Sequence, residues 1–335
     1  MEFNLLYIGP LNKNGTCYQR SIAFEKIFSN VEKIDTYLYK SSFFYYFNVL
    51  LNKFNVWLDF VGVNNSILSV NKKYDLIWID KGLIIKDSSL KYLKERFASK
   101  LIHYSPDDML NPGNQSFYYL EALSTYDVHI TTKSYNVDEL KNLGAKKVIF
   151  INNSFDDLYH VRVPNICQKF DIGFIGSFEK ERAAILLNLA KKGFSMVIRG
   201  NWPIRWVKIL KDYNVDILSN ELYFPDYSLF IASCKINLCF LRKANRDLQT
   251  TRSIEIPAMG GFMLAEDTSE HRSLFVSDDQ AVFFSNEEEL EEKISFYLRN
   301  DDLRKTIAEN GYMRTIDSGY SNYRSFSILF DKILK

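Results

Sequence analysis

A carboxylate inside an apolar segment is the feature of this sequence that most clearly needs a chemical explanation. The segment RSIEIPAMGGFMLAE (252–266) keeps Glu255 between Ile254 and Ile256. A buried carboxylate without a partner is destabilising or becomes neutral through a shifted pKa, so we expect Glu255 to bind something. A helix cap or a surface salt bridge is one interpretation. The other is a ligand with two neighbouring hydroxyls, because one carboxylate accepts both hydrogen bonds.

Arg252 precedes Glu255 by three residues, and two interpretations follow from this spacing. On a helix, residues at i and i+3 form an ion pair worth a few tenths of a kcal/mol. Alternatively, Arg252 binds an anion such as a diphosphate. Gly260 and Gly261 form a turn in the same segment and belong to the same candidate site.

Two strand ends in the second half of the sequence run into glycine turns that suit a phosphate. A strand that enters a helix through such a turn offers backbone N–H groups and the positive end of the helix dipole. An ordinary tight turn is the alternative interpretation. The candidates are Gly176, Ser177 and Arg182 in GFIGSFEKER (173–182), and Arg199 and Gly200 in IRGNW (198–202).

In the first half, SPDDMLNPG (105–113) follows a predicted strand and has the composition of a turn. The alternative is a catalytic role, in which Asp107 or Asp108, with His103 nearby, meets the hydroxyl of an acceptor. In an inverting reaction one of these aspartates would be the general base.

Several other chemistries lack their motifs. No GxGxxG follows a strand, and the P-loop and GxSxG motifs are absent. The four histidines show no metal-ligand spacing, and no Asp-x-Asp occurs. We therefore predict no metal site and no bound cofactor.

Composition excludes further classes of protein. The 42 basic and 41 acidic residues give a net charge of +1, which does not favour nucleic acid as a partner. No window of 18 apolar residues predicts a transmembrane helix, and MEFNLLYIG does not resemble a signal peptide. The scattered Cys17, Cys167, Cys234 and Cys239 do not suggest disulfides, so we expect a cytoplasmic location.

Apolar runs alternate with helical patterns and predict two Rossmann-like α/β halves of a 335-residue chain. We expect an N-terminal domain over 1–160, a linker within 154–168, and a C-terminal domain over 168–318. A last helix within 319–335 is expected to pack onto the first domain. The predicted strands are 4–9, 74–80, 100–105, 127–132 and 147–152, followed by 170–176, 195–200, 235–241, 261–266 and 281–285.

The segment 41–60 places aromatic and apolar residues on one helical stripe, which normally predicts a core. The alternative is peripheral contact with a membrane, or capture of a lipid-linked acceptor. The stripe contains Phe43, Phe47, Leu50, Phe54 and either Trp57 or Leu58.

The second half resembles the group 1 glycosyltransferases, and most of all their CgeB-like branch. The resemblance is carried by Asp247 eight positions before Glu255, by PAMGGFMLAE (257–266) and by residues 288–312. Residues 103–112 and 118–156 are also similar to that branch. The resemblance implies a GT-B fold, two Rossmann-like domains facing a cleft, with a nucleotide-sugar donor on the C-terminal domain and an acceptor on the N-terminal one. Asp247 replaces the first Glu of the family's motif, whose role is to contact the sugar.

We therefore expect a metal-independent enzyme that moves a sugar from a nucleoside diphosphate sugar to a glycan, lipid-linked or protein acceptor of the cell surface. Glu255 would bind the donor ribose and Arg252 the diphosphate, and the paired-acid motif favours retention of configuration. A GT-B nucleotide-sugar epimerase and a non-catalytic nucleotide- or carbohydrate-binding protein are the alternatives. The enzyme would act in the cytoplasm or at the inner face of the membrane.

Overall fold

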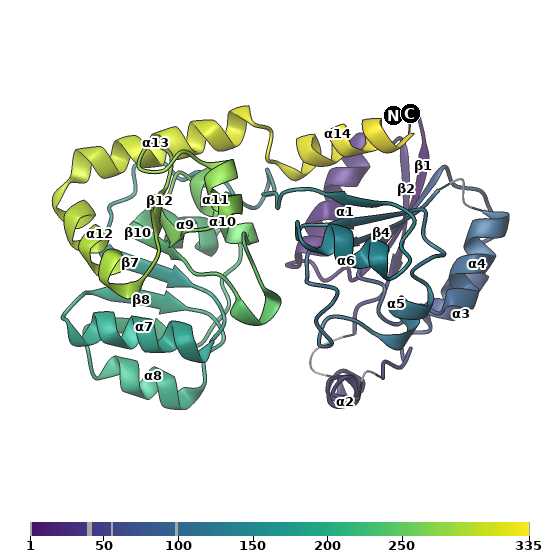
Figure 1. Cartoon of the computed structure of the whole chain (residues 1–335), viewed down its shortest axis with the longest axis horizontal. Coiled ribbons are helices and arrows are strands. Elements are labelled where there is room, and N and C mark those ends of the chain that lie inside the picture. Colours follow the sequence, from purple (N-terminus) through teal and green to yellow (C-terminus); the bar gives the residue numbers. More distant parts are fainter. Residues whose placement is uncertain (1, 39–41, 55, 98–99, 335) are drawn as a thin grey trace. The chain divides into compact units, whose positions relative to one another are not determined.

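The chain forms two compact units, which we call unit 1 (Met1–Asn152 with Phe326–Lys335) and unit 2 (Asn153–Ser325). The computed structural model describes residues 2–38, 42–54, 56–97 and 100–334. Each unit contains one six-stranded sheet covered by helices (Figure 1). The strand pairs of both sheets are parallel, so the expected α/β class with two Rossmann-like halves is confirmed.

The sheet of unit 1 has the strand order β2-β1-β3-β4-β5-β6. Its strands are β1 (Asn4–Gly9), β2 (Asn30–Asp35), β3 (Leu76–Asp80), β4 (Leu101–Ser105), β5 (Val128–Thr131) and β6 (Val148–Phe150). Its helices are α1 (Thr16–Ile27), α2 (Phe43–Asn52), α3 (Val63–Leu68), α4 (Asp87–Arg96), α5 (Phe117–Glu121), α6 (Asn136–Asn142) and most of α14 (Asn322–Leu334). The apolar runs predicted every strand except β2.

Both faces of this sheet are covered, which explains why its strands are apolar throughout. Tyr7 of β1 packs with α1 and α14, whereas the next residue, Ile8, packs with α3 and α4 on the opposite face. The rings of Phe326 and Phe330 in α14 lie 5.1 and 5.0 Å from the ring of Phe24 in α1. The last helix of the chain therefore completes the core of the first unit.

The sheet of unit 2 has the order β12-β11-β10-β7-β8-β9. Its strands are β7 (Phe170–Ile175), β8 (Met196–Arg199), β9 (Val215–Leu218), β10 (Cys234–Cys239), β11 (Met263–Glu266) and β12 (Val282–Phe284). Its helical segments are α7 (Lys180–Lys191), α8 (Ile204–Lys211), α9 (Asp226–Ser233), the 3-10 turn η1 (Lys243–Asn245), α10 (Thr251–Ala258), α11 (Ser269–Leu274), α12 (Glu287–Arg299) and α13 (Asp301–Asp317). Here β9 is the strand that the sequence did not predict.

Unit 2 also has helices on both faces of its sheet. Ile198 of β8 packs with α7, α8 and α12, whereas Val197 packs with α9, α10 and α11. Phe155, from the segment expected to be a linker, is buried in the second of these cores. Its burial explains why unit 2 begins at Asn153, before the expected start at residue 168.

Each sheet reverses its strand order at one point, and this point positions the functional residues. The reversal lies between β1 and β3 in unit 1 and between β7 and β10 in unit 2. The helices that follow the two strands lie on opposite faces there, which opens a crevice at the carboxyl ends where ligands of doubly wound sheets bind.

Helix α2 differs from the prediction that its stripe lies in a core. Phe43, Leu50 and Phe54 are 75%, 52% and 74% exposed, so the prediction is wrong for these residues. The buried residue of α2 is instead Asn48, which donates to Leu58 O (2.9 Å) and accepts from Leu58 N (3.0 Å). A polar anchor holds this helix, and its apolar side chains remain at the surface.

Ser41 and Asn55 of the expected segment 41–60 lie outside the described residues. None of the helices in the described part of the chain combines the length and apolar character that crossing a bilayer requires.

Candidate functional site

Helix α10 carries Arg252 and Glu255 at the strand-order reversal of unit 2. The helix follows β10, so its first turn lies at the carboxyl edge of the sheet. A capping box between Thr250 and Ser253 fixes this turn. Ser253 Oγ also lies 2.7 Å from Nε2 of the buried His271, whose Nδ1 lies 2.6 Å from Glu266 O. Burial lowers the pKa of His271. The neutral ring therefore accepts from Ser253 and helps to hold α10 in place.

Glu255 is buried and has partners within the protein. The hydroxyl of Tyr227 donates to Glu255 Oε2 (2.9 Å), and His160 Nε2 lies 3.5 Å from Oε1. The N–H of Asp156 donates to His160 Nδ1 (2.9 Å), which leaves the Nε2 proton directed at the carboxylate. Tyr227 and His160 thus occupy part of the hydrogen-bonding capacity of Glu255. The carboxylate has further lone pairs that can accept from a ligand. No sequence spacing links Tyr227 or His160 to Glu255, and the prediction missed both.

Arg252 and Arg182 form a pair of cations with unmet donors. The Nε atom of each guanidinium is buried and has no hydrogen-bond partner among the described residues. Burial, and next to it the charge of Arg252, lower the pKa of Arg182. Buried donors normally have partners, and neighbouring like charges repel. An anion bound between the two arginines would satisfy both requirements.

Arg182 also joins the two loops that border the reversal point. It donates to Ser177 O (2.7 Å) after β7 and to Leu241 O (3.2 Å) after β10. Its guanidinium lies 5.2 Å from the ring of Phe174. The side chain thus fixes the width of the crevice, and Ser177 takes part through its carbonyl oxygen.

The glycines at the ends of β7 and β8 allow close packing of two loops. Gly200 has φ of 138°, and a Cβ atom there would lie 2.1 Å from Gly176 O. That same oxygen accepts from Trp202 Nε1 (2.9 Å). This packing accounts for Gly200 without a ligand, and at Gly176 a Cβ atom would lie 2.8 Å from the ring of Phe174.

Arg199 is directed to a different part of unit 2 than Arg252. Its Nη2 donates to Asp216 Oδ2 (2.9 Å) and its Nη1 donates to Asp216 O (2.9 Å), on the edge strand β9. Arg199 does not lie with the arginine pair. In the strand order, β8 and β9 lie beyond β7, on the side away from the reversal between β7 and β10.

Gly260 and Gly261 end helix α10. Gly260 has φ of 74°, its N–H donates to Pro257 O (2.8 Å), and the N–H of Gly261 donates to Ile256 O (3.0 Å). These two bonds form a Schellman cap. The cap lies at the opposite end of the helix from Arg252 and explains both glycines.

Asp247 shapes the loop after β10. Its carboxylate accepts from Asn245 Nδ2 (2.8 Å) and from the N–H of Arg242 (3.4 Å). The loop contains η1 and the left-handed residue Arg246 (φ 47°). Asp247 therefore fixes the loop that borders the crevice of unit 2.

In unit 1, Lys81 and Asp107 form an ion pair at the reversal point. Lys81 Nζ lies 2.9 Å from Asp107 Oδ2, and the charge of Asp107 raises the pKa of Lys81. Lys81 (φ 68°) and Gly82 (φ 64°) both have left-handed backbone at the end of β3. For lysine this conformation is strained, and such strain is concentrated at functional sites. The sequence analysis missed Lys81, and its position directly after a predicted strand was the available signal.

The other two candidates in unit 1 lie in the interior. His103 is 1% exposed, with Nε2 3.1 Å from Lys81 O and Nδ1 3.3 Å from His129 Nδ1. Asp108 is also 1% exposed and accepts from Asn136 Nδ2 (3.0 Å). Burial lowers the pKa of His103. His103 contacts the backbone of Lys81, and both His103 and Asp108 are too buried to contact an acceptor. Of the three residues predicted to meet the acceptor hydroxyl, Asp107 therefore remains the candidate.

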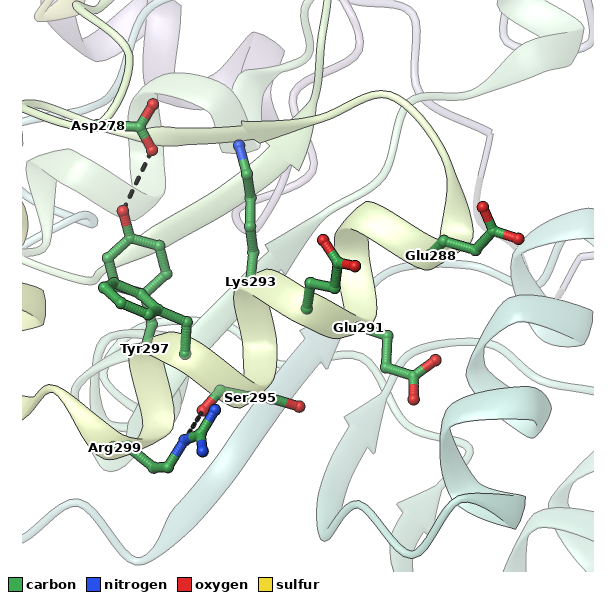
Figure 2. Close-up of a pocket in the computed structure, with 9 residues that line it drawn as sticks. Asp278, Glu288, Glu291, Lys293, Ser295, Tyr297 and Arg299 are labelled. Carbon is green, nitrogen blue, oxygen red and sulfur yellow. Dashed lines mark hydrogen bonds between the residues drawn. The ribbon is translucent and has the colours of Figure 1, made fainter.

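Two hollows of unit 2 do not coincide with the arginine pair. The first, of about 760 Å³, runs along α12, where Tyr297 donates to Asp278 (Figure 2). The second, of about 550 Å³, is lined by Arg182 and Lys243, by acidic residues such as Glu179 and Glu266, and by apolar residues such as Phe240. Neither is lined by Arg252 or Glu255. Among the described residues, no group of three His, Cys, Asp or Glu side chains is placed to hold a metal ion.

Comparison with known proteins now adds to this geometry. Residues 182–329 match the family described as "Glycosyl transferase-like". No curated protein matches the sequence.

Solved structures share the fold at low sequence identity. Sucrose-phosphate synthase from Thermosynechococcus elongatus matches with a TM-score of 0.66 and 12% identity over 98% of each chain. HepE from Anabaena, in complex with UDP, matches with a TM-score of 0.67 and 13% identity over 98% of this chain and 99% of that chain. A glycosyltransferase from Rickettsia africae matches with a TM-score of 0.60 and 14% identity over 100% and 99%.

The fold is therefore the GT-B fold that the resemblance implied. The family match and the shared fold together support an enzyme of the glycosyltransferase type, as the resemblance to the group 1 glycosyltransferases predicts. The CgeB-like branch stays a prediction.

Proposed function

We propose that this protein transfers a sugar from a nucleoside diphosphate sugar, bound by unit 2, to a hydroxyl of an acceptor, bound by unit 1. The observation that carries the proposal is the pair Arg252 and Arg182, whose buried Nε donors have no partner among the described residues. A diphosphate supplies acceptor oxygens for these donors, and it adds negative charge to that of Glu179, whose Oε2 lies 3.7 Å from Arg182 Nη2. The match to the glycosyltransferase-like family over most of unit 2 favours the same ligand.

Donor binding divides between Arg252 and Glu255. Arg252 binds the diphosphate, and Glu255 accepts the ribose hydroxyls through lone pairs that Tyr227 and His160 leave open. Arg182, fixed by two carbonyl oxygens, contributes its charge without moving. UDP is the first nucleotide to test, because HepE, which shares the fold, was solved with UDP and with UDP-glucose.

The chemical step breaks the bond between the anomeric carbon and the diphosphate oxygen, and the electron pair leaves with the diphosphate. The acceptor oxygen forms the new bond and loses its proton. Preformed positive charge at Arg252 and Arg182 stabilises the leaving group without a metal ion. In an inverting reaction Asp107, which forms an ion pair with Lys81, takes the proton. In a retaining reaction the departing diphosphate oxygen takes the proton, and Asp247 contacts the sugar, as the group 1 resemblance implies.

The glycan, lipid-linked or protein nature of the acceptor belongs to the proposal, as do the cell-surface role and contact with a membrane. We also propose a cytoplasmic location, because all four cysteines are free thiols and the compartment would then be a reducing one.

A thermal-shift panel of UDP, GDP, ADP and TDP tests the donor site. We expect one nucleotide to raise the unfolding temperature, and the corresponding nucleotide sugar to be consumed in the presence of an acceptor and excess EDTA. Failure of all four nucleotides would contradict the proposal. Loss of turnover with EDTA that Mn²⁺ or Mg²⁺ restores would contradict metal independence. Conversion of the donor without any acceptor would identify an epimerase instead.

A further inference from the structure

A pocket of about 300 Å³ occupies the strand-order reversal of unit 1. Pro10 after β1 and Lys81 and Gly82 after β3 border it, and α2 contributes Tyr45 and Val49. This is the position at which doubly wound sheets bind their ligands. All of its lining residues belong to unit 1, so the pocket exists within that unit alone.

The pocket has an apolar lining with few polar groups. Tyr45, Val49, Trp57 and Leu83 supply apolar surface, and among the described lining residues Lys81 alone is charged. The amide of Asn48 is already engaged by Leu58. The indole N–H of Trp57 is buried and has no partner among the described residues. The lining therefore suits a ligand with a long apolar part and a polar end.

The outer surface of α2 extends this apolar character to the solvent. The helix contains no charged residue between Phe43 and Asn52. The rings of Phe43 and Phe47 stack at 5.9 Å, and those of Phe44 and Phe60 at 4.7 Å. Phe43 is 75% exposed and Phe44 49% exposed. Exposed aromatic residues of this kind are typical of surfaces that meet the boundary of a lipid layer.

We propose that this pocket binds the apolar chain of a lipid-linked acceptor. The chain enters beside α2 and lies against Tyr45, Val49 and Trp57, while the polar head group points to Lys81 and its partner Asp107. The assignment of this ligand as the acceptor rests on the proposed function. The presence of a site for an apolar chain does not rest on the proposed function, because it follows from the lining of the pocket.

Titration calorimetry with methyl, phenyl and octyl glucoside, below the micelle concentration of octyl glucoside, tests the proposal. The three probes share one sugar and differ in the apolar group. Because each buried methylene adds to the hydrophobic free energy, we expect octyl glucoside to bind at least tenfold more tightly than methyl glucoside. Equal affinities would overturn the proposal. Tighter binding of phenyl glucoside than of octyl glucoside would reject a lipid chain in favour of an aromatic group.

Two tryptophan variants on α2 locate the site. Val49→Trp fills the pocket, whereas Leu50→Trp adds the same side chain at the next residue, which does not line it. Both positions are exposed by about half (46% and 52%), so both variants should fold, which circular dichroism checks. We expect Val49→Trp to reduce the octyl-to-methyl preference to less than threefold and Leu50→Trp to leave it unchanged. An unchanged preference in Val49→Trp would place binding elsewhere on the surface and overturn the proposal.

Failure of the proposed function would give a different result. If the protein binds octyl glucoside at Val49 but no nucleoside diphosphate, the pocket is an apolar-chain site and glycosyl transfer is wrong. If the protein binds a nucleotide but shows no preference for the octyl chain, the proposal of glycosyl transfer is retained and the proposal of a lipid-linked acceptor is wrong.

Discussion

The two units build the same kind of parallel sheet but line the reversal of strand order with opposite chemistry. In unit 2 the crevice contains Arg182 and Arg252, whose Nε donors have no hydrogen-bond partner in the described part of the chain, and Glu255 lies on the same helix as Arg252. In unit 1 the corresponding position is an apolar pocket with Lys81 as its charged residue. One unit therefore suits an anionic ligand and the other an amphipathic one.

This difference shows that the fold fixes where ligands bind and the loops fix which ligands bind. Both crevices follow from strand order alone. Helices α7 and α10 bring the positive charge of Arg182 and Arg252 to one crevice. The left-handed turn at Lys81 and Gly82 and the helix α2 make the other crevice mainly apolar. A division of labour between donor and acceptor follows, and it can be tested one unit at a time.

The largest expected effect concerns turnover and belongs to unit 1. Asp107→Asn removes the proposed base while keeping the size of the side chain, so we expect turnover to fall roughly 10²- to 10⁴-fold. Nucleotide affinity should not change, because Asp107 lies outside unit 2. Steady-state assays and nucleotide titration separate the two quantities.

The matched control is Asp138→Asn on α6, whose carboxylate is 89% exposed and should be neutral to activity. Full activity of Asp107→Asn would show that Asp107 is not the general base. A retaining reaction, with Asp247 at the sugar, would then be the remaining version of the chemical step.

Glu255→Gln should affect unit 2 alone. The change keeps the shape of the side chain and removes its charge and one acceptor oxygen, so charge-assisted bonds to the ribose are lost. We expect nucleotide binding to weaken by about 2 to 3 kcal/mol, or roughly 30- to 150-fold. Titration calorimetry measures the loss, and circular dichroism confirms the fold.

Tyr227→Phe tests the competing interpretation, in which Glu255 only serves its protein partners. If Glu255→Gln binds nucleotide as tightly as the unchanged protein, while Tyr227→Phe and Glu255→Gln both reduce stability, Glu255 is structural.

A smaller effect is expected in mild acid, at the base of α10. Burial holds the pKa of His271 below its ordinary value of 6.5, so the unfolded chain binds a proton that the folded chain does not. Stability from this group is therefore complete above pH 6.5 and is lost as the pH falls below it, by at most about 1.4 kcal/mol per pH unit. Hydrogen exchange of residues 251–258 at pH 7 and pH 5, corrected for intrinsic rates, measures the loss.

His271→Asn keeps a donor for Glu266 O and does not titrate in this range. We expect it to reduce the pH dependence of protection in α10, whatever its stability at pH 7. The same pH dependence in the variant would mean that another group controls α10 in acid.

The sequence predicted the apolar framework better than its edges. Ten apolar runs gave ten strands, because central parallel strands are buried on both faces. The edge strands β6 and β12 were predicted because they too are apolar, whereas the edge strands β2 and β9 were missed because they carry polar residues such as Glu32, Lys33 and Asp216. The stripe on α2 was misassigned to a core, because periodicity shows that apolar residues share a face but not what covers that face.

The candidate site was predictable where its residues are neighbours in the chain. Arg252 and Glu255 lie on one helix, and their spacing showed this. Tyr227 and His160 were not predictable, because tertiary folding alone brings them to Glu255. Gly260 and Gly261 lie just after the helix that one interpretation of the Arg252–Glu255 spacing implied, and could have been recognised as part of its cap.

The most direct test of the account is calorimetric titration of UDP, or of the nucleotide selected by thermal shift, into the unchanged protein, Arg252→Ala and Arg199→Ala. The central claim is that Arg252, whose buried Nε has no hydrogen-bond partner among the described residues, binds the diphosphate, whereas Arg199 already pairs with Asp216. We expect Arg252→Ala to weaken binding about 100-fold, as the loss of charge-assisted hydrogen bonds requires, and Arg199→Ala to change it less than threefold. Equal binding by a folded Arg252→Ala protein would contradict the account.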